Sequence, residues 1–404
     1  MGGTRRQAPP GTPARATVMD FELSETQTLL KDSARRFLAE NYTAAAQRGA
    51  RAAGRSDVIW KAFADLGWLG APFAEEYGGS GGDCTDVAII MEELGRALGV
   101  EPYLSTIVLC GGLLAREGSA AQQLSLMSRM AAGDHFMALA HAEPRSRYDL
   151  AHVETTAHPA QTGHWRLNGR KSLVLHGGTA DDFIVVARTG GETAERDGLS
   201  LYIVPRDAAG LEIRDYPTVD GAHACDLALD DVTVGDDAIL GQVGRGYQPL
   251  AEAIEMGRLA ICAEAVGLMD VTLTATLDYV RTRVQFGRPI GTFQVVQHRF
   301  ADMFVELEQT RSLLYLAAIR LRDGHVDAPA AVSALKVQTG RAGRFIGQQG
   351  VQLHGGVGMT DDLNIGWALK RLLAIEFLFG DVDFHVDRFQ QLRVAAPSAS
   401  VLSS

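Results

Sequence analysis

The apolar residues of this 404-residue chain change their spacing twice, and this limits the folds that it can adopt. Up to about residue 131 they recur every three or four positions, as on one face of a helix. From about residue 134 they form short runs rich in branched side chains, which are typical of strands. From about residue 246 the helical spacing returns. The sequence therefore predicts an α+β chain in which a β domain lies between two helical domains.

The domain borders are placed where these patterns change. The first 18 residues are rich in Gly, Pro and Ala and are expected to form a disordered tail, with Met19 as an alternative start of translation. The remaining segments are residues 19–133 for an N-terminal helical domain, 134–245 for a middle β domain, 246–393 for a C-terminal helical domain and 394–404 for a second tail.

Local signals add detail to this outline. Ser24-x-x-Gln27 has the form of a helix capping box, and helical spacing also covers residues 56–66, 85–97 and 104–131. Asn168-Gly169 stands between two strand-like runs and predicts a tight hairpin turn. The C-terminal domain is expected to hold long helices over residues 247–282, 293–323 and 329–354, and a shorter one near 364–378.

Composition excludes several classes of function. The net charge of −11 argues against nucleic acid as the main partner. The four cysteines are widely spread without a CxxC pair, so neither a metal site nor a disulfide framework is expected. No run of 18 uninterrupted apolar residues is present, so no membrane span is expected. The cytoplasm is the expected location.

The glycine-rich loop at residues 78–82 is a weak candidate for phosphate binding. It lacks both the Lys-Ser/Thr of a P-loop and the GxGxxG spacing of a dinucleotide fold. We interpret it as a tight connection between helices.

Two other motifs contain residue types that suit a nucleotide. The loop RVQFGRPIGTFQ (283–294) joins two long helices and combines arginine, aromatic and amide side chains with glycine, which suits a pyrophosphate and an adenine. A plain helix connection explains it equally well. The segment QQGVQLHGGVG (348–358) ends a helix with three glycines within four residues, more than a C-cap requires. Its His354 is either an acid/base residue or a structural histidine.

Taken together, the helical–β–helical order, the loop at 75–83, RVQFGRPIGTFQ and GVQLHGGVGMT (350–360) resemble the acyl-CoA dehydrogenase family over residues 19–393. The resemblance implies an N-terminal helical bundle, a middle β domain and a C-terminal four-helix bundle. It also implies a tetramer in which FAD is shared across a subunit interface. The implied reaction is α,β-dehydrogenation of an acyl-CoA: a carboxylate removes the α proton, the β hydride passes to flavin N5, and electrons leave to an electron-transfer flavoprotein.

Within the family, the chain looks most similar to the small subunits of pimeloyl-CoA dehydrogenases. The segments that carry this similarity are AHAEPRSRYDLAHVETTA (140–157), KSLVLHG (171–177), CAEAVG (262–267) and GRAGRFIGQQGVQLHGG (340–356). This resemblance implies a heterotetramer with a large subunit, as an alternative to a homotetramer. It also implies pimeloyl-CoA or another medium-chain acyl-CoA as substrate.

The resemblance assigns the following site residues. The pyrophosphate and adenine of FAD fall at Arg283, Phe286, Phe293 and Gln294. The FAD of a neighbouring subunit falls at Gln352, Leu353, Gly355 and Gly356. Arg258 matches an arginine beside the CoA and acyl site, and Ser146 is a weaker candidate for the flavin or CoA region.

Several positions depart from the family pattern. The threonine that meets the flavin is Ala142, and the following Trp-Ile-Thr reads Leu173-Val174-Leu175. The two family positions for the glutamate base are occupied by Gly257 and by Phe379 or Gly380. Two nearby carboxylates are therefore candidate bases. Glu255 precedes Arg258 by one helical turn and is either the base or a salt-bridge partner of that arginine. Asp381 is either the base or a helix cap.

Three functions follow from these observations. The chain is an active flavin dehydrogenase with a displaced base, or a base-lacking subunit that builds half of each FAD site while a large partner supplies the carboxylate. The third alternative is a flavin oxidase or monooxygenase on the same fold.

Overall fold

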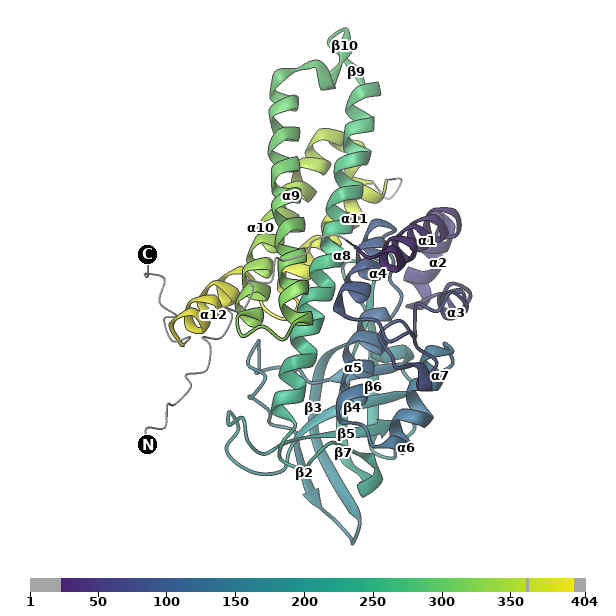
Figure 1. Ribbon diagram of the computed structural model, residues 1–404, viewed down its shortest axis with the longest axis vertical. Coiled ribbons are helices and arrows are strands. Elements are labelled where there is room, and N and C mark those ends of the chain that lie inside the picture. Colours follow the sequence, from purple (N-terminus) through teal and green to yellow (C-terminus); the bar gives the residue numbers. More distant parts are fainter. Residues whose placement is uncertain (1–22, 361–362, 396–404) are drawn as a thin grey trace, which may run out of the picture.

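The computed structural model describes residues 23–360 and 363–395, and its β sheet lies at one end of a mainly helical body (Figure 1). The predicted tail at residues 1–18, Met19 and most of the tail at 394–404 lie outside the described residues. The order of a helical, a β and a second helical domain is confirmed. The first helical group ends at Ala131, the first strand begins at Met137, and the second helical group begins at Tyr247.

The N-terminal domain begins with the predicted capping box. The Ser24 hydroxyl accepts a hydrogen bond from the Gln27 amide, and the Gln27 side chain accepts one from the Ser24 amide. The helices are α1 (Glu25–Asn41), α2 (Ala44–Ala53), α3 (Asp57–Asp65), η1 (Glu75–Tyr77), α4 (Cys84–Arg96), η2 (Tyr103–Gly111), α5 (Gly112–Glu117), α6 (Ala120–Gln122), η3 (Gln123–Met127) and α7 (Ser128–Ala131). The predicted helix over 104–131 is interrupted at Gly118, which is extended, and Ser119 caps the next helix.

The glycine-rich loop is a tight connection, as the sequence predicts. It links η1 to α4, and the Gly81 amide donates to the Phe73 carbonyl at 2.8 Å. A Cβ atom on Gly79 would overlap that same carbonyl oxygen. Close backbone packing therefore explains the glycine here without a phosphate.

The middle domain is one eight-stranded sheet with the order β6-β7-β3-β2-β4-β5-β8, and β1 pairs with β4. The pairs are antiparallel except β1–β4 and β2–β4. The elements are β1 (Met137–Ala140), β2 (Thr156–Pro159), β3 (His164–Leu175), η4 (Gly177–Thr179), β4 (Asp182–Arg188), β5 (Leu199–Pro205), β6 (Leu211–Pro217), β7 (His223–Gly235), η5 (Asp236–Ala238) and β8 (Ile239–Leu240).

The predicted hairpin turn at Asn168-Gly169 is wrong. Both residues lie within the continuous strand β3, where the pairing with β7 shifts register between Leu167 and Gly169. The Asn168 side chain and Asp231 share two hydrogen bonds. Asn168 Nδ2 donates to the Asp231 carboxylate at 3.0 Å, and the Asp231 backbone amide donates to Asn168 Oδ1 at 2.9 Å. The bulge thus gives the Asn168 side chain hydrogen-bond partners on the neighbouring strand, and the strand continues without a turn.

The C-terminal domain contains the four predicted helices and one more. They are α8 (Tyr247–Thr282), α9 (Gln294–Arg322), α10 (Ala328–His354), α11 (Asn364–Phe377) and α12 (Val382–Ala395). The short elements β9 (Val284–Gln285), β10 (Arg288–Pro289) and η6 (Ile290–Thr292) join α8 to α9, and η7 (Gly355–Met359) follows α10. The paired ends of α8 and α9 project well beyond the rest of the molecule (Figure 1).

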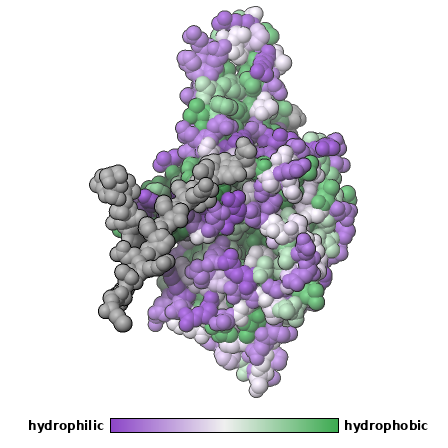
Figure 2. Space-filling view, in the orientation of Figure 1, coloured by the Kyte–Doolittle hydropathy of each residue, from purple (hydrophilic) through white to green (hydrophobic). Residues whose placement is uncertain are grey.

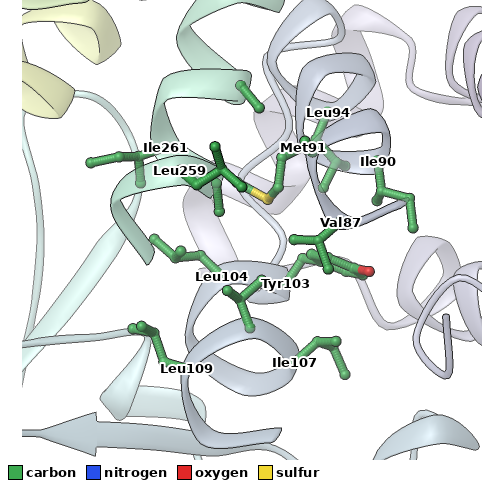
Figure 3. Close-up of a cluster of buried hydrophobic side chains, with 14 of the residues drawn as sticks. Val87, Ile90, Met91, Leu94, Tyr103, Leu104, Ile107, Leu109, Leu259 and Ile261 are labelled. Atoms are coloured by element: carbon green, nitrogen blue, oxygen red, sulfur yellow. The ribbon is translucent and has the colours of Figure 1, made fainter. Parts of the chain in front are cut away.

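Helix α8 is the centre of the molecule. Its side chains Leu259 and Ile261 lie beside Met91 of α4 and Leu104 of η2 in one apolar core (Figure 3). By length and composition α8 could cross a membrane, but 72% of its most apolar window is buried inside the protein. That burial is expected for the core helix of a bundle.

Candidate functional site

A largely apolar cavity lies where the helical and β domains meet. Its wall is formed by η2, the end of β1 and the residues that follow it, β3, α8 and the end of α11. The polar side chains on the wall are Ser105, His141, Arg147, Tyr148 and Arg258. Within the described part of the chain, no carboxylate lines this cavity.

Phe379 occupies the space where the resemblance places the base. It lines the cavity itself, and a Cβ atom on Gly257 would lie 3.2 Å from Cε2 of its ring and 2.9 Å from Cδ2 of Leu109. A glutamate at position 257 would therefore collide with this ring. Both family positions are thus filled by one aromatic side chain.

Hydrogen bonds from neighbouring helices fix the backbone around Phe379. Its carbonyl accepts from Arg258 Nε at 3.0 Å and from His385 Nε2 at 3.1 Å. The Lys336 ammonium donates to the carbonyls of Ile375 and Leu378 at 2.8 and 2.9 Å. Burial lowers the pKa of Lys336 to about 8.

The structure places Glu255 in a salt-bridge cluster, away from the cavity wall. It is buried, and its carboxylate meets Arg258 at 2.9 Å and Arg388 at 2.6 Å. Since it is absent from the wall, this geometry matches the salt-bridge alternative. It opposes the prediction that Glu255 is the base.

Asp381 also lies off the cavity wall. Its Oδ1 accepts a hydrogen bond from the Phe384 amide at 2.9 Å, at the start of α12. It also faces Tyr148, whose pKa is raised by burial and then by Asp381. The structure therefore gives Asp381 the role of a helix cap, which was the alternative to its being the base.

Ser146 does not reach the cavity either. Its hydroxyl accepts from the Glu143 amide at 3.0 Å and donates to the Glu143 carbonyl at 3.1 Å, which closes a buried turn. The structure thus gives Ser146 a local structural role, in place of the predicted ligand contact.

A buried ion pair holds the strand ends that the resemblance places against the flavin. Lys171 and Glu143 meet at 2.7 Å, and Glu143 also accepts from the Thr155 amide at 3.0 Å. Although burial opposes ionisation, Lys171 keeps the pKa of Glu143 below its usual value. The Ser172 amide donates to the Ala142 carbonyl at 2.9 Å. These contacts fix Ala142 beside Leu173 on the cavity wall.

The candidate cofactor loop lies at the tip of the α8–α9 projection. Phe286 is 90% exposed, and its ring meets Phe293 edge to face at 6.2 Å. The Arg288 guanidinium stacks over the Phe293 ring at 4.2 Å. Arg283 and Gln294 stand at the two ends of this loop. The loop therefore offers aromatic surface, cations and an amide to a ligand that comes from outside the chain.

The second cofactor motif, Gln352 to Gly356, lies close to the same end of α8. The His354 ring stacks on Tyr279, which is one turn before Arg283, with centroids 4.4 Å apart. Its Nδ1 donates a hydrogen bond to the Gly350 carbonyl at 2.8 Å. His354 therefore has the structural role that was the alternative to acid/base chemistry. Nothing lies within 4 Å of a Cβ built on Gly355 or Gly356, which leaves open backbone for a ligand. These parts fit the adenosine diphosphate portion of FAD.

The cavity and the cofactor loop are too far apart to share one cofactor within a single chain. Arg258 and Arg283 are separated by 25 residues of α8, or about 38 Å at 1.5 Å per residue. This is longer than an extended FAD molecule. The loop and the cavity therefore lie at well-separated positions along α8.

Three side chains on the wall were not predicted from the sequence. His141, Arg147 and Tyr148 all lie in or beside the segment AHAEPRSRYD. The sequence did carry a signal for His141, which comes directly after the short apolar strand β1. Alternate residues of a strand share one face, so His141 lies on the same face as Leu139.

Comparisons with known proteins agree with this architecture. Family models for the N-terminal, middle and C-terminal domains of acyl-CoA dehydrogenases match residues 24–134, 138–232 and 244–391. The mitochondrial isovaleryl-CoA dehydrogenase of Solanum tuberosum is 32% identical over 86% of this chain and 85% of its own length. A short-chain-specific acyl-CoA dehydrogenase of Clostridium acetobutylicum is 30% identical over 85% and 91%.

Solved structures show the same fold. Butyryl-CoA dehydrogenase from Megasphaera elsdenii has a TM-score of 0.87 at 25% identity, and covers 93% of this chain and 100% of its own. A complex of PigA with FAD has a TM-score of 0.85 at 26% identity, over 93% and 100%. With all three of its domains matched, the chain belongs to the acyl-CoA dehydrogenase family of FAD-dependent oxidoreductases.

Proposed function

We propose that this chain serves FAD-dependent α,β-dehydrogenation of an acyl-CoA as one subunit of a heteromeric enzyme. It contributes the loop at 283–294 to a flavin site in a larger partner subunit, and the partner supplies the carboxylate base. The observation that carries this proposal is the cavity wall without a carboxylate, among the described residues, with Phe379 in the place of the base. Bound FAD would accept the hydride that leaves the β carbon.

The chemistry explains why the missing carboxylate matters. The α proton of a thioester is weakly acidic, so a positioned base near neutral pH is needed to remove it. The described wall of the cavity provides His141, Tyr148 and two arginines for polar contact, but no carboxylate. The chain's own residues support a binding role: Arg283 would pair with the pyrophosphate, and Gln294 would meet the adenine.

The surface of the projection supports assembly with another chain. Apolar surface gathers there below the polar tip (Figure 2), and α9 exposes Val295, Phe304 and Val305. A solved structure that shares this fold is the ChsE4-ChsE5 complex of Mycobacterium tuberculosis, with a TM-score of 0.85 at 25% identity over 94% of this chain. That complex joins two differently named proteins, which is the type of assembly proposed here.

The remaining parts of the proposal are the substrate, the electron acceptor and the location. We extend it to pimeloyl-CoA or another medium-chain acyl-CoA, to an electron-transfer flavoprotein and to the cytoplasm. A solved structure named for the electron transferring flavoprotein of Acidaminococcus fermentans shares this fold, at 26% identity and a TM-score of 0.87. This likeness supports the choice of electron acceptor.

Flavin content and flavin reduction test the proposal. The chain would be purified alone and with a co-expressed larger family member, and octanoyl-CoA or pimeloyl-CoA would be added without oxygen. We expect one FAD per pair of chains in the complex, and bleaching of the flavin band only there. Bleaching in the chain alone would show that it carries its own base, and would overturn the proposal.

A further inference from the structure

The two cofactor segments of this chain come from different helices. The loop at 283–294 joins α8 to α9, whereas Gly355 and Gly356 follow α10. Because the two segments are far apart in the sequence, neither fixes the position of the other through the chain itself. A ligand that meets both segments binds best when their spacing is already set, since ordering them later costs binding free energy. Contacts between the ends of α8 and α10 are where this spacing is set.

Tyr279 of α8 contacts His354, the residue directly before the glycines. Their rings are stacked, with centroids 4.4 Å apart and planes inclined by 26°. The Tyr279 hydroxyl also donates to the His354 carbonyl at 3.3 Å. His354 is buried, and the hydrogen bond from its Nδ1 to the Gly350 carbonyl fixes the ring. Tyr279 thus holds both the ring and the backbone of the last residue of α10.

The backbone of Tyr279 is joined to the cofactor loop. Its carbonyl accepts a hydrogen bond from the Arg283 amide at 2.8 Å, where the loop begins. The Arg283 carbonyl in turn accepts from the Ile290 amide at 2.9 Å. A Cβ atom on Gly291 would lie 3.1 Å from the Val280 carbonyl oxygen. The loop is therefore folded back against the turn of α8 that carries Tyr279.

The helices α8 and α10 also approach each other closely before this contact. A Cβ atom on Gly350 would lie 2.8 Å from Cγ2 of Thr272. Beyond His354 the backbone is open, because no described atom lies within 4 Å of a Cβ built on either glycine at 355–356. The Tyr279–His354 stack therefore lies between the packed part of the two helices and the backbone that a ligand can reach.

We propose that Tyr279 is a positioning residue that holds the glycines at 355–356 and the loop at 283–294 as one preformed surface for the adenosine diphosphate portion of FAD. Tyr279 acts through His354 and does not itself bind the cofactor. This inference rests on the proposed function, in which the chain supplies that surface to a flavin site. The stack replaces ordering that FAD would otherwise impose, so its loss lowers the affinity without removing a ligand contact.

The FAD affinity of the assembled enzyme tests this role. The chain would be purified with its co-expressed larger partner, stripped of flavin and titrated with FAD, and binding followed by flavin fluorescence. Tyr279→Leu removes the stack, whereas Tyr279→Phe keeps the ring and loses only the hydroxyl group. Tyr315→Leu is the matched control, because Tyr315 is also half-buried but lies far along α9 from the loop. Circular dichroism of each variant would establish that it is folded.

We expect FAD to bind about three- to tenfold more weakly in Tyr279→Leu, as for the loss of one aromatic stack. Tyr279→Phe and Tyr315→Leu should bind FAD close to the native affinity. Because Tyr279 acts through His354, Tyr279→Leu should cause no further loss of affinity in a chain that already carries His354→Leu. Native affinity in Tyr279→Leu, or additive losses in the double variant, would overturn the inference.

Hydrogen–deuterium exchange of the chain alone gives a second readout that needs no cofactor. We expect the backbone amides of residues 350–360 to exchange about three- to tenfold faster in Tyr279→Leu, and at the native rate in Tyr279→Phe. Unchanged exchange in Tyr279→Leu would show that the stack does not hold this segment, and would overturn the inference. Flavin bleaching by the chain alone would contradict the proposed function, whereas the FAD titration and the exchange test only the role of Tyr279.

Discussion

At the scale of single residues, Phe379 is held in a conformation that few side chains adopt. Its φ angle is +58°, a region that costs a non-glycine residue about 1–2 kcal/mol. Hydrogen bonds from Arg258 and His385 to its carbonyl offset this cost. The same backbone conformation directs its ring against Gly257, where it closes off the two positions for a base.

Phe379→Glu should give the cavity a base. A carboxylate at this position would face a bound acyl-CoA, and a positioned general base typically contributes about 100-fold or more to proton transfer. We expect exchange of the α hydrogens of octanoyl-CoA in D2O to rise by about that factor. Phe379→Gln has nearly the same shape without the charge and should leave exchange at the buffer rate. Equal exchange in the two variants would show that position 379 does not face the α carbon.

Arg283→Ala should weaken the retention of FAD. A hydrogen bond to a charged group contributes about 1.5–3 kcal/mol, which corresponds to FAD binding weaker by about ten- to a hundredfold. FAD affinity of the assembled enzyme would be measured by ultrafiltration and flavin absorbance. Arg281→Ala is the control, since Arg281 is exposed two residues earlier and its one ion pair, with Asp278, is long at 3.9 Å. Full FAD occupancy in Arg283→Ala would remove this loop from the cofactor site.

At the scale of elements, two glycines allow α4 and α8 to cross with their backbones in contact. A Cβ atom on Gly95 would overlap the Glu264 carbonyl, and one on Gly267 would overlap the Glu92 carbonyl. The two helices also share charged side chains, because Arg96 of α4 pairs with Asp270 of α8. This crossing fixes α8, and therefore fixes Arg258 beneath the cavity.

Gly267→Ala should destabilise the protein, because the added methyl group has no space at the crossing. Overpacking of this kind typically costs about 1–3 kcal/mol. Gly49→Ala is the matched control in α2, where nothing lies within 4 Å of a built Cβ. There the change should stabilise by about 0.5–1 kcal/mol, because alanine favours a helix. Urea unfolding of both variants measures the difference, and equal midpoints would contradict the crossing.

The long elements could be predicted from the sequence because their signals are local. The helices α8 to α11 follow from apolar spacing over many turns, and Ser24 with Gln27 marks the start of α1. The sequence wrongly indicated a turn at Asn168, because the residue that holds its side chain in the strand, Asp231, is distant in the sequence. Helix α12 was missed because it is short and more polar than α8 to α11, and its place in the domain depends on packing against α10. Which side chains share the cavity depends on contacts between domains, so His141 was missed.

At the scale of the whole molecule, a buried carboxyl group lies where the three domains meet. Glu101 lines a small internal cavity with Ala222 of the sheet region, Glu264 of α8 and Arg371 of α11. Burial raises the pKa of Glu101 to about 8, although Tyr42 opposes this. The junction therefore holds a neutral carboxyl group at neutral pH.

Stability should fall with pH because of Glu101. The folded chain keeps a proton that the unfolded chain releases above its ordinary pKa of about 4.3, so the native protein loses up to about 1.4 kcal/mol per pH unit between about pH 5 and 8. Glu101→Gln removes this dependence. We therefore expect Glu101→Gln to gain stability relative to the native chain between pH 5 and pH 8. Urea midpoints that keep the same difference at both pH values would contradict the assignment.

The separation of the cofactor loop from the cavity along α8 has a genetic consequence. A chain whose loop is damaged still carries the intact surfaces with which it meets its partner. In the heteromeric enzyme proposed above, a copy with Arg283→Ala expressed beside the native chain would occupy partner subunits and leave their flavin sites incomplete. Such an allele would be dominant over the native gene, whereas one that prevents folding would be recessive.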